Sequence, residues 1–444
     1  MTSADSAEVP TKEAVIGNDD YALHRVPQNA RHHWFSIATQ RFGQLSALPQ
    51  FMLGATLGMG MSFWEAVGAI TLGAAILEIV AIVVGVIGVR EGMSTSVLAR
   101  WTGFGRYGAA LISLTIAISL VGWFGIQNAV FAEGLHSLLG GPPLWVWTLI
   151  AGVFVTLIVV GGIGGMRWTA YVTVPLFIAL AGWSIASELS RHSLGTLVSS
   201  PAPGPSLSMT AATTLVAGSF IAGAVITPDM TRYNRGIADV IKQTVVGITL
   251  GEYVIGLIGV LLAHALRTGN VVSIVVSTSG TIGVIILVAS TLKINDWNLY
   301  SSSLGFVNII DTLTGRRVDR ALVTVVLGVA GTLLAAAGIL GHFTDFLIVL
   351  GVALPPVAGI MIAEYFVVRR WRPVLDAAGD AVPDRAPAWV PASLVLWLAA
   401  FLVGKYVTWG IPALNSLVFA FAGYAFAGKL GLTRGVGSET ERKQ

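Results

Sequence analysis

The chain has no cysteine among its 444 residues, and only 11% of its residues are charged. The absence of cysteine excludes a disulfide framework, a thiolate metal site, an iron–sulfur cluster and a cysteine nucleophile. Soluble domains carry roughly 25% charged residues, whereas 55% of this chain is hydrophobic and its mean hydropathy is +0.78. A formal net charge of +3 is too small to suggest a nucleic-acid partner. The composition therefore excludes a soluble globule and predicts a polytopic membrane protein.

Apolar blocks of about 20 residues, the length that a hydrocarbon core requires of a helix, fill most of the chain. Backbone groups in lipid must bond within their own segment, so we interpret these blocks as helices. The first 31 residues are polar and lack the apolar core of a cleavable signal, and we expect them to form a tail (1–31). With glycine, proline and charge clusters as boundaries, twelve transmembrane helices are predicted, at 32–61, 63–88, 104–138, 144–162, 168–188, 209–228, 238–265, 273–304, 321–339, 344–368, 389–405 and 412–430.

Lys and Arg are distributed unequally between the two sides of this arrangement. An even number of spans places both termini on the same side. If that side is the cytoplasm, all but four of the 26 Lys and Arg lie in cytoplasmic segments, and the exceptions are Arg191, Arg267, Lys405 and, inside the eighth block, Lys293. Positively charged loops stay in the cytoplasm. We therefore expect a protein of the inner cell membrane whose N-terminus and C-terminal tail (431–444) are cytoplasmic.

The first and sixth blocks carry helix-disfavouring residues at mid-depth, at 42–49 and 217–223. A single glycine at such a depth is also typical of close helix packing. A pair of interrupted segments five spans apart, however, indicates a transporter built from inverted repeats. We therefore expect one repeat at 32–188 and a second at 209–368, followed by two further helices within 389–430.

One face of the third block combines an aromatic ring with an amide. Trp123 and Gln127 are four residues apart, so they lie on the same side of a helix. A flat heterocycle can stack on an indole while an amide hydrogen-bonds to its edge. A packed tryptophan, with the glutamine bonded to a neighbouring helix, is the structural alternative.

The eighth block contains more polar residues than lipid tolerates. Intramembrane ionisable residues are functional hypotheses by default, and the polar residues of this block include Ser290, Thr291, Lys293, Asn295, Asp296 and Asn298. An ion pair between Lys293 and Asp296, three residues apart, is the structural alternative. Glu78, Glu252 and Glu364 also lie in apolar blocks, either as proton carriers or as hydrogen-bonding residues between helices.

Motifs of other membrane protein classes are missing. The chain has no His-Glu-x-x-His, serine-elbow or paired-aspartate protease pattern, so an intramembrane enzyme would lack its catalytic groups. It also has no repeated filter segment or charge ring, as a channel would need. A transporter, or a sensor with the same fold, therefore remains.

Five motifs together resemble the nucleobase-cation-symport-1 family, and particularly its cytosine permease branch. They are NDDYALHRVP at 18–27 with Arg31 after it, GATLGMGMS at 54–62, GWFG at 122–125, TPDMTRY at 227–233 and NDWNLY at 295–300. The resemblance implies an all-α LeuT-type fold of five plus five helices with broken first and sixth helices. It also implies cation-coupled transport of nucleobases, hydantoins or allantoin without a cofactor.

The resemblance assigns candidate substrate residues. Trp123 matches the family's stacking tryptophan, and Ser219 with Phe220 matches the sixth-span pair that contacts the base. Asn295 and Asn298 fall in the segment whose asparagines contact the edge of the base, and either one can be the match. Gln127 stands where the hydantoin-type branch has its glutamine, whereas Leu120 occupies the corresponding cytosine permease position. Which heterocycle is carried therefore stays open.

The resemblance also assigns a candidate site for the coupling ion. Its candidate ligands are the first-span residues Gly43 and Ser46, whose backbone carbonyls would hold sodium, and Ser290 and Thr291. The cytosine branch has threonines just before its Asn-Asp, where this chain has Lys293 and Ile294. A fixed ammonium near the site would repel sodium, so Lys293 and Asp296 are candidate coupling residues. Sodium coupling, proton coupling, uniport and substrate sensing without transport are the alternatives.

Overall fold

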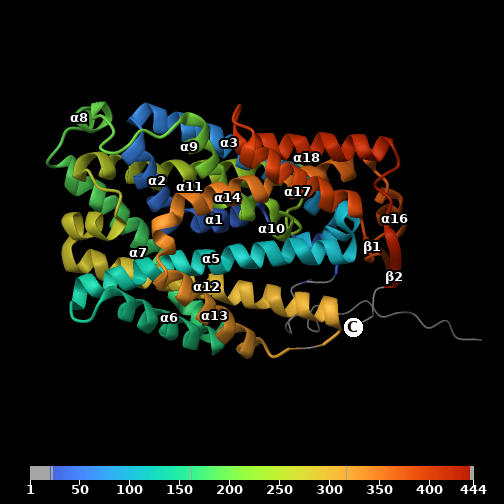
Figure 1. Ribbon diagram of the computed structural model, residues 1–444, viewed down its shortest axis with the longest axis horizontal. Coiled ribbons are helices and arrows are strands. Elements are labelled where there is room, and N and C mark those ends of the chain that lie inside the picture. The colour runs from blue at the N-terminus through green and yellow to red at the C-terminus, as the bar shows by residue number, and fades with distance from the viewer. Residues whose placement is uncertain (1–20, 22–23, 162, 317, 441–444) are drawn as a thin grey trace, which may run out of the picture.

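The computed structural model describes residues 21, 24–161, 163–316 and 318–440 (Figure 1). The helices of the first half are α1 (Trp34–Leu45), α2 (Leu48–Gly60), α3 (Phe63–Glu91), α4 (Thr95–Leu98), α5 (Gly105–Leu139), α6 (Leu144–Val160), α7 (Ile163–Leu189) and α8 (Leu194–Ser199). Those of the second half are α9 (Met209–Val225), α10 (Pro228–Thr231), α11 (Ile237–Leu266), α12 (Val271–Thr314), α13 (Arg320–Ala336), α14 (Phe343–Ala353), α15 (Pro355–Ile362), α16 (Arg372–Ala377), α17 (Pro391–Tyr406) and α18 (Pro412–Lys429). Short 3-10 or π turns occupy Gln28–Ala30, Arg100–Phe104, Ile339–His342 and Ala363–Val368.

Five helical segments of the described chain are long and apolar enough to cross a membrane. They are Phe63–Glu91, Arg100–Leu139, Ile237–Leu266, Val271–Thr314 and Ile339–Val368. Shorter apolar helices, such as Leu144–Val160 and Met209–Val225, lie among them. The chain is therefore a multi-pass membrane protein, and the count of twelve spans stays a prediction.

The first apolar block forms two helices. Helix α1 ends at Leu45, Ser46 has φ −80° and ψ 59°, and Ala47 is extended. Helix α2 then begins at Leu48 with Pro49 in its first turn, where the missing N–H of proline costs no helical hydrogen bond. The helical hydrogen-bond ladder ends here, because the N–H of Ser46 still donates to Phe42 but the N–H of Ala47 donates to Leu45 and not to Gly43.

The interruption that we expect at 217–223 is wrong, because α9 is helical from Met209 to Val225. The glycine in this stretch has a packing role instead. A Cβ on Gly218 would collide with the carbonyl oxygen of Leu347 on α14. The chain leaves the helix only at Ile226, before the short α10.

A small sheet corrects the all-α expectation. Strand β1 (Arg385–Trp389) pairs antiparallel with β2 (Val436–Thr440), with Arg385 opposite Thr440 and Trp389 opposite Val436. The two strands lie on either side of α17 and α18 in the sequence, so the chain has no short hairpin turn from which the pair could be predicted. The strand β2 lies within the segment expected to be a cytoplasmic tail.

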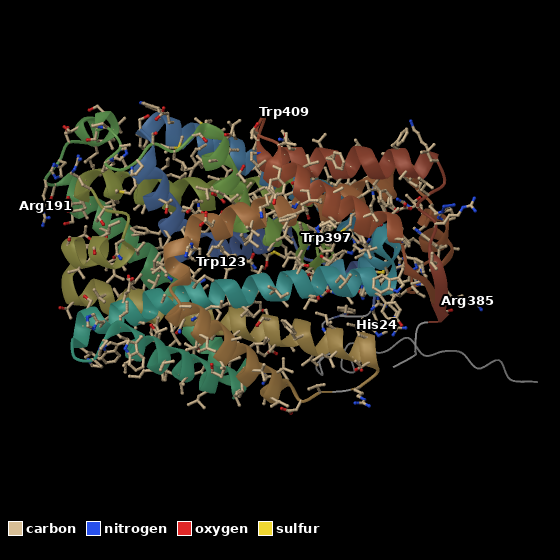
Figure 2. All side chains as sticks on the ribbon, viewed as in Figure 1. His24, Trp123, Arg191, Arg385, Trp397 and Trp409 are labelled. Carbon is tan, nitrogen blue, oxygen red and sulfur yellow. The ribbon has the colours of Figure 1, made fainter. Side chains whose placement is uncertain are left out.

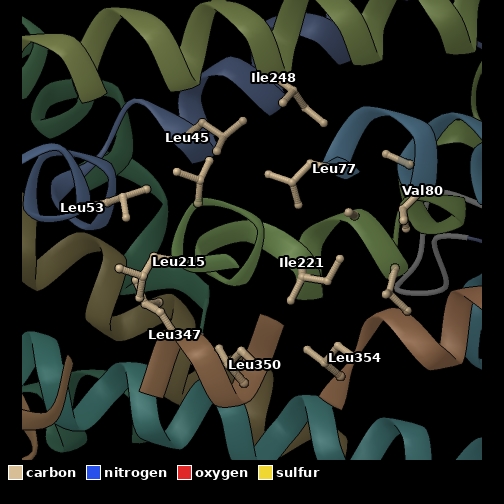
Figure 3. Packing of buried hydrophobic residues seen from close by; sticks show 14 of the residues in the cluster. Leu45, Leu53, Leu77, Val80, Leu215, Ile221, Ile248, Leu347, Leu350 and Leu354 are labelled. Carbon is tan, nitrogen blue, oxygen red and sulfur yellow. The ribbon is translucent and has the colours of Figure 1, made fainter. Parts of the chain in front are cut away.

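The helices form two packed groups. Helices α1, α2, α3, α9, α11 and α14 share one hydrophobic core, in which Leu45, Leu77, Leu215, Ile248 and Leu347 meet (Figure 3). A second cluster joins α5, α6, α12 and α13 around Phe124, Val155 and Leu327. Helix α5 packs along α12 between these groups, and it carries the candidate stacking residue.

Candidate functional site

Trp123 lies on α5, well inside the molecule, between the ends marked by Arg191 and Arg385 (Figure 2). Its side chain is 7% exposed. The indole makes edge contacts with two rings of α14, with centroid distances of 6.1 Å to Phe343 and 5.3 Å to Phe346. The interplanar angles are 68° and 87°, so both pairs have the edge-to-face geometry that aromatic rings favour.

The closeness of α14 to α5 depends on a glycine. A Cβ on Gly122 would lie 2.5 Å from the Phe346 ring, so a larger residue there would displace the ring. The sequence analysis did not include Phe343 or Phe346, because they are more than two hundred residues away from Trp123. The GWFG motif was the available signal, since its small residues permit close approach.

Gln127 lies one turn beyond Trp123 and is 1% exposed. Its Oε1 atom has no hydrogen-bond partner among the described residues. The neighbouring Asn128 differs, because its Nδ2 atom donates to the carbonyl oxygen of Thr148 at 3.0 Å and so links α5 to α6. The Oδ1 atom of Asn128 also has no partner among the described residues, but its nitrogen holds that amide against α6, whereas Gln127 lies on the Trp123 face of α5.

Helix α12 supplies more unpaired amide atoms. Asn295 is fully buried, and within the described chain neither Oδ1 nor Nδ2 has a hydrogen-bond partner. The Nδ2 atom of Asn298 is in the same state. Buried polar groups are nearly always hydrogen-bonded, so each exception needs an explanation. Because α5 packs along α12, both helices bring unpaired amides to the interior of one region.

Ser219 and Phe220 lie on α9 and are half-buried. The Ser219 hydroxyl donates to the carbonyl oxygen of Val216 at 2.7 Å and keeps its lone pairs. The Phe220 ring lies over Gly223 of its own helix, and its centroid is 6.0 Å from the guanidinium carbon of Arg41. The ring contacts found among described residues join Trp123 to α14 and not to Phe220.

The candidate ion residues lie at the break between α1 and α2 and on α12. Ser46 is buried, and its Oγ atom has no partner in the described part of the chain. Gly43 belongs to the last turn of α1, whose final carbonyls have no intrahelical donor. On α12, the hydroxyls of Ser290 and Thr291 donate to the carbonyl oxygens of Thr173 and Leu287, at 3.4 and 2.7 Å. Their lone pairs remain, so this oxygen set is compatible with a cation of the kind that broken helices bind.

Lys293 forms the ion pair that the spacing allows. Its Nζ atom lies 3.1 Å from Oδ1 of Asp296, and the two side chains are 13% and 1% exposed. The charge of the ammonium is thus shared with a buried carboxylate of the same helix.

Arg41 is a site feature that the sequence analysis did not single out. It is fully buried on α1, and it donates to Gln243 Oε1 and to Thr227 Oγ1, both at 3.1 Å. No carboxylate of the described residues lies within ion-pair distance of it. The signal in the sequence was a lone arginine inside an apolar block.

A cavity of about 240 Å³ lies between α2, α5, α12 and α14. Its lining includes Thr56, Glu133, Asn270 and Phe343, and Asn270 Nδ2 donates to Glu133 Oε2 at 3.1 Å. Because Phe343 also contacts Trp123, this ring separates the cavity from the indole.

The N-terminal motif is bonded to several segments at one end of the molecule. Arg25 binds the carboxylate of Glu91 at 2.8 Å and donates to the carbonyl oxygen of Ala381 at 2.8 Å. Arg31 donates to the carbonyl oxygen of Val89 at 2.8 Å, and burial lowers the pKa of its guanidinium. His24 and Arg385 lie at this same end, opposite Arg191 (Figure 2).

Comparisons with known proteins agree with this fold. A family model described as permease for cytosine/purines, uracil, thiamine, allantoin matches residues 25–380. A cytosine permease of Escherichia coli (strain K12) is 29% identical over 397 residues, which cover 85% of this chain and 92% of that protein. A hydantoin permease of Microbacterium maritypicum is 25% identical over 369 residues, which cover 76% of this chain and 73% of that protein.

Solved structures share the architecture. The inward-facing conformation of Mhp1 superposes with a TM-score of 0.78 at 22% identity and covers 92% of this chain and 93% of that one. A closed conformation of Mhp1, described as a nucleobase-cation-symport-1 family transporter with bromovinylhydantoin bound, gives a TM-score of 0.71 at 21% identity, with the same coverage.

The fold thus defines a LeuT-type membrane transporter and not an enzyme. The chain belongs to the family of permeases for cytosine/purines, uracil, thiamine and allantoin, within the nucleobase-cation-symport-1 group. The family expected from the five sequence motifs is confirmed.

Proposed function

We propose that the protein is a secondary active transporter that imports a nucleobase or a related cytosine-, purine- or hydantoin-like heterocycle by alternating access, coupled to sodium or protons. Twelve transmembrane helices form two inverted repeats at 32–188 and 209–368, and two helices follow within 389–430. The break at Ser46 supports an interrupted first span, and in the sixth span the chain leaves the helix at Ile226, near the end of the expected block. The protein lies in the inner cell membrane with both termini in the cytoplasm. The distribution of Lys and Arg favours this orientation.

The unpaired amides of α5 and α12 are the observation that carries this proposal. A buried polar group without a partner costs about 1 to 3 kcal/mol, and these atoms belong to Gln127, Asn295 and Asn298. Helix α5 contributes an acceptor, the Oε1 atom of Gln127, and α12 contributes an acceptor and two donors, from Asn295 and Asn298. The edge of a nucleobase or hydantoin alternates N–H donors with carbonyl acceptors, so such a ligand would satisfy them.

Stacking provides the second half of recognition. Trp123 offers a buried indole that stands nearly perpendicular to the two rings of α14, and Phe220 offers a half-buried ring on α9. A heterocycle between these helices would stack on Trp123 and meet Phe220, while the Ser219 hydroxyl accepts a hydrogen bond from its edge. The cavity beside Phe343 would be the entrance, with the ring as its gate.

For the coupling ion, we propose the oxygen atoms of Gly43, Ser46, Ser290 and Thr291. The unpaired Oγ of Ser46 supports this assignment. Lys293 forms an ion pair with Asp296 of the same helix. This pairing supports a lysine side chain that is held away from the ion site, so that sodium can bind there. Uniport with the ammonium in the place of sodium is the alternative that the same lysine raises.

The test has a binding arm and a flux arm. Purified protein is heated with cytosine, uracil, purines, hydantoins and allantoin, and a ligand at 100 times its Kd stabilises by about 2.7 kcal/mol. Uptake of the best ligand into proteoliposomes then follows. Ligand binding without uptake would indicate a sensor, and no binding by any heterocycle would contradict the proposed substrate class.

A further inference from the structure

Glu252 is a fully buried carboxyl on α11 that the proposed transport mechanism does not use. Its Oε2 atom lies 2.6 Å from Nε2 of Gln50, and its Oε1 atom has no hydrogen-bond partner in the described chain. No Lys, Arg or His of the described residues lies within ion-pair distance of it. Glu188 on α7 is equally buried but binds Arg191 at 3.1 Å, so the missing cation at Glu252 is not a general property of this interior.

An isolated carboxylate is very unfavourable in an apolar interior, and such groups become neutral by taking up a proton. The distance to Gln50 fits a carboxylic acid, because 2.6 Å is short for an N–H donor but ordinary for an O–H donor. The oxygen and nitrogen of a glutamine amide are assigned from their hydrogen bonds. With the amide turned, a protonated Glu252 donates to the amide oxygen of Gln50, at the loss of the longer 3.4 Å bond from Gln50 Nε2 to the backbone carbonyl oxygen of Glu252.

A second carboxyl near Glu252 further disfavours its ionised form. Glu78 on α3 accepts a hydrogen bond of 2.6 Å from Thr249, which precedes Glu252 by one turn of α11, and the two carboxyls are close enough to repel each other as anions. The hydroxyl of Tyr253 is bonded to that of Thr71 on α3.

Several charged groups on other elements that contact α11 have partners of their own. On α1, the Arg41 guanidinium is directed to Gln243 and Thr227. On α7, Glu188 is bound by Arg191. On α12, Lys293 and Asp296 pair with each other, so none of these described groups supplies a cation to Glu252.

The Gln50 contact joins two helices that touch through their backbones. Gln50 lies in the first turn of α2, just after the break. A Cβ on Gly54 would collide with the carbonyl oxygen of Gly256, and one on Gly58 would lie 2.7 Å from that of Val260. Glu252 is fully buried beside this contact, so it would meet water when α2 moves away from α11.

We propose that Glu252 and Gln50 form a proton-binding site whose occupancy holds α2 against α11. Binding converts the carboxylate and one proton from water into the carboxylic acid, and release reverses this when the two helices separate. The site itself stands on the geometry alone, whereas its link to transport rests on the proposed function. It adds a proton to the cycle whichever ion binds beside Ser46.

The first test needs no substrate. Thermal unfolding of the purified full chain is measured between pH 5.5 and 8.5 for wild type and for Glu252→Gln, which mimics the protonated acid. Unfolding exposes Glu252 to water, where it ionises, so the folded-to-unfolded ratio of wild type should fall by about tenfold per pH unit relative to the variant. Glu188→Gln is the matched control and should keep the wild-type slope.

Equal slopes in wild type and Glu252→Gln would overturn the proposal. Glu252→Asp provides a second check, because it keeps a carboxyl at the site and should keep the slope. Loss of the slope in that variant would also count against the site.

The transport arm uses the best ligand of the heterocycle panel. Uptake into proteoliposomes should depend on pH in wild type and not in Glu252→Gln, while exchange of labelled for unlabelled ligand persists in both. Unchanged pH dependence in Glu252→Gln would overturn the link to transport. A protein that transports no heterocycle would contradict the proposed function, and the unfolding slopes would still decide the proton site.

Discussion

Replacing Asn295 with leucine separates a ligand-binding residue from a packing residue, because the two roles predict opposite changes in stability. Both amide atoms of Asn295 are buried without a hydrogen-bond partner in the described chain. An unsatisfied buried group costs about 1 to 3 kcal/mol, and leucine has a similar shape. The ligand-free variant should therefore be more stable than wild type, with a melting temperature raised by roughly 1 to 3 °C for a chain of this size.

The same substitution should weaken ligand binding. Without the amide, the polar edge of a heterocycle would be buried without partners, at a cost of about 1 to 3 kcal/mol. This corresponds to a Kd about tenfold to a hundredfold higher. Thermal unfolding without ligand and calorimetric titration with the best ligand of the panel give the two quantities.

Gln243→Met is the control for this experiment. Gln243 is as deeply buried as Asn295, but its Oε1 accepts from Arg41 at 3.1 Å and its Nε2 donates to Thr244 at 2.7 Å. Its replacement leaves Arg41 short of an acceptor and should lower the melting temperature. If Asn295→Leu also lowers the melting temperature and leaves the affinity unchanged, Asn295 is a packing residue and the reasoning from unpaired amides is refuted.

Three further changes test other parts of the molecule. Trp123→Ala should weaken ligand binding about tenfold to a hundredfold, the equivalent of 1 to 3 kcal/mol of stacking; an unchanged Kd in titration would assign the indole to packing. Gly54→Ala should lower the free energy of unfolding by about 1 to 3 kcal/mol, because the new Cβ is overpacked against Gly256. Gly43→Ala is its control and should be neutral or stabilising, since nothing lies within 4 Å of the new Cβ. Equal melting temperatures of the two variants would contradict the packing argument. Replacing sodium by choline should weaken substrate binding in wild type; unchanged binding would contradict the proposed sodium site and leave proton coupling or the Lys293 ammonium in its place.

Properties that depend on neighbouring residues in the sequence were predictable. Blocks of apolar residues define helices because lipid leaves the backbone no other partner, and the long helices α3, α5, α11 and α12 lie in blocks identified in this way. The i, i+4 spacing of Trp123 and Gln127 needs only helical geometry. The five motifs were enough to identify the family, which the comparisons confirm.

Properties that depend on contacts between distant segments were not predictable. Gly218 was interpreted as a break, but α9 continues through it and uses it to approach Leu347 of α14. A glycine in isolation does not distinguish a break from a close contact, since its lack of a Cβ permits both. The pairing of β1 with β2 has the same cause, because each strand finds its partner only across α17 and α18.

The sequence by itself determined that this chain spans a membrane, belongs to a permease family and carries an aromatic and amide face on its third apolar block. The tertiary structure decided which of its polar atoms have partners. The amide nitrogen of Asn128 has a partner on α6 whereas both amide atoms of Asn295 have none in the described chain, and Glu188 is paired with an arginine whereas Glu252 meets only an amide. Composition and spacing along one helix do not contain this information, because a hydrogen bond or an ion pair between helices depends on the packing that brings them together.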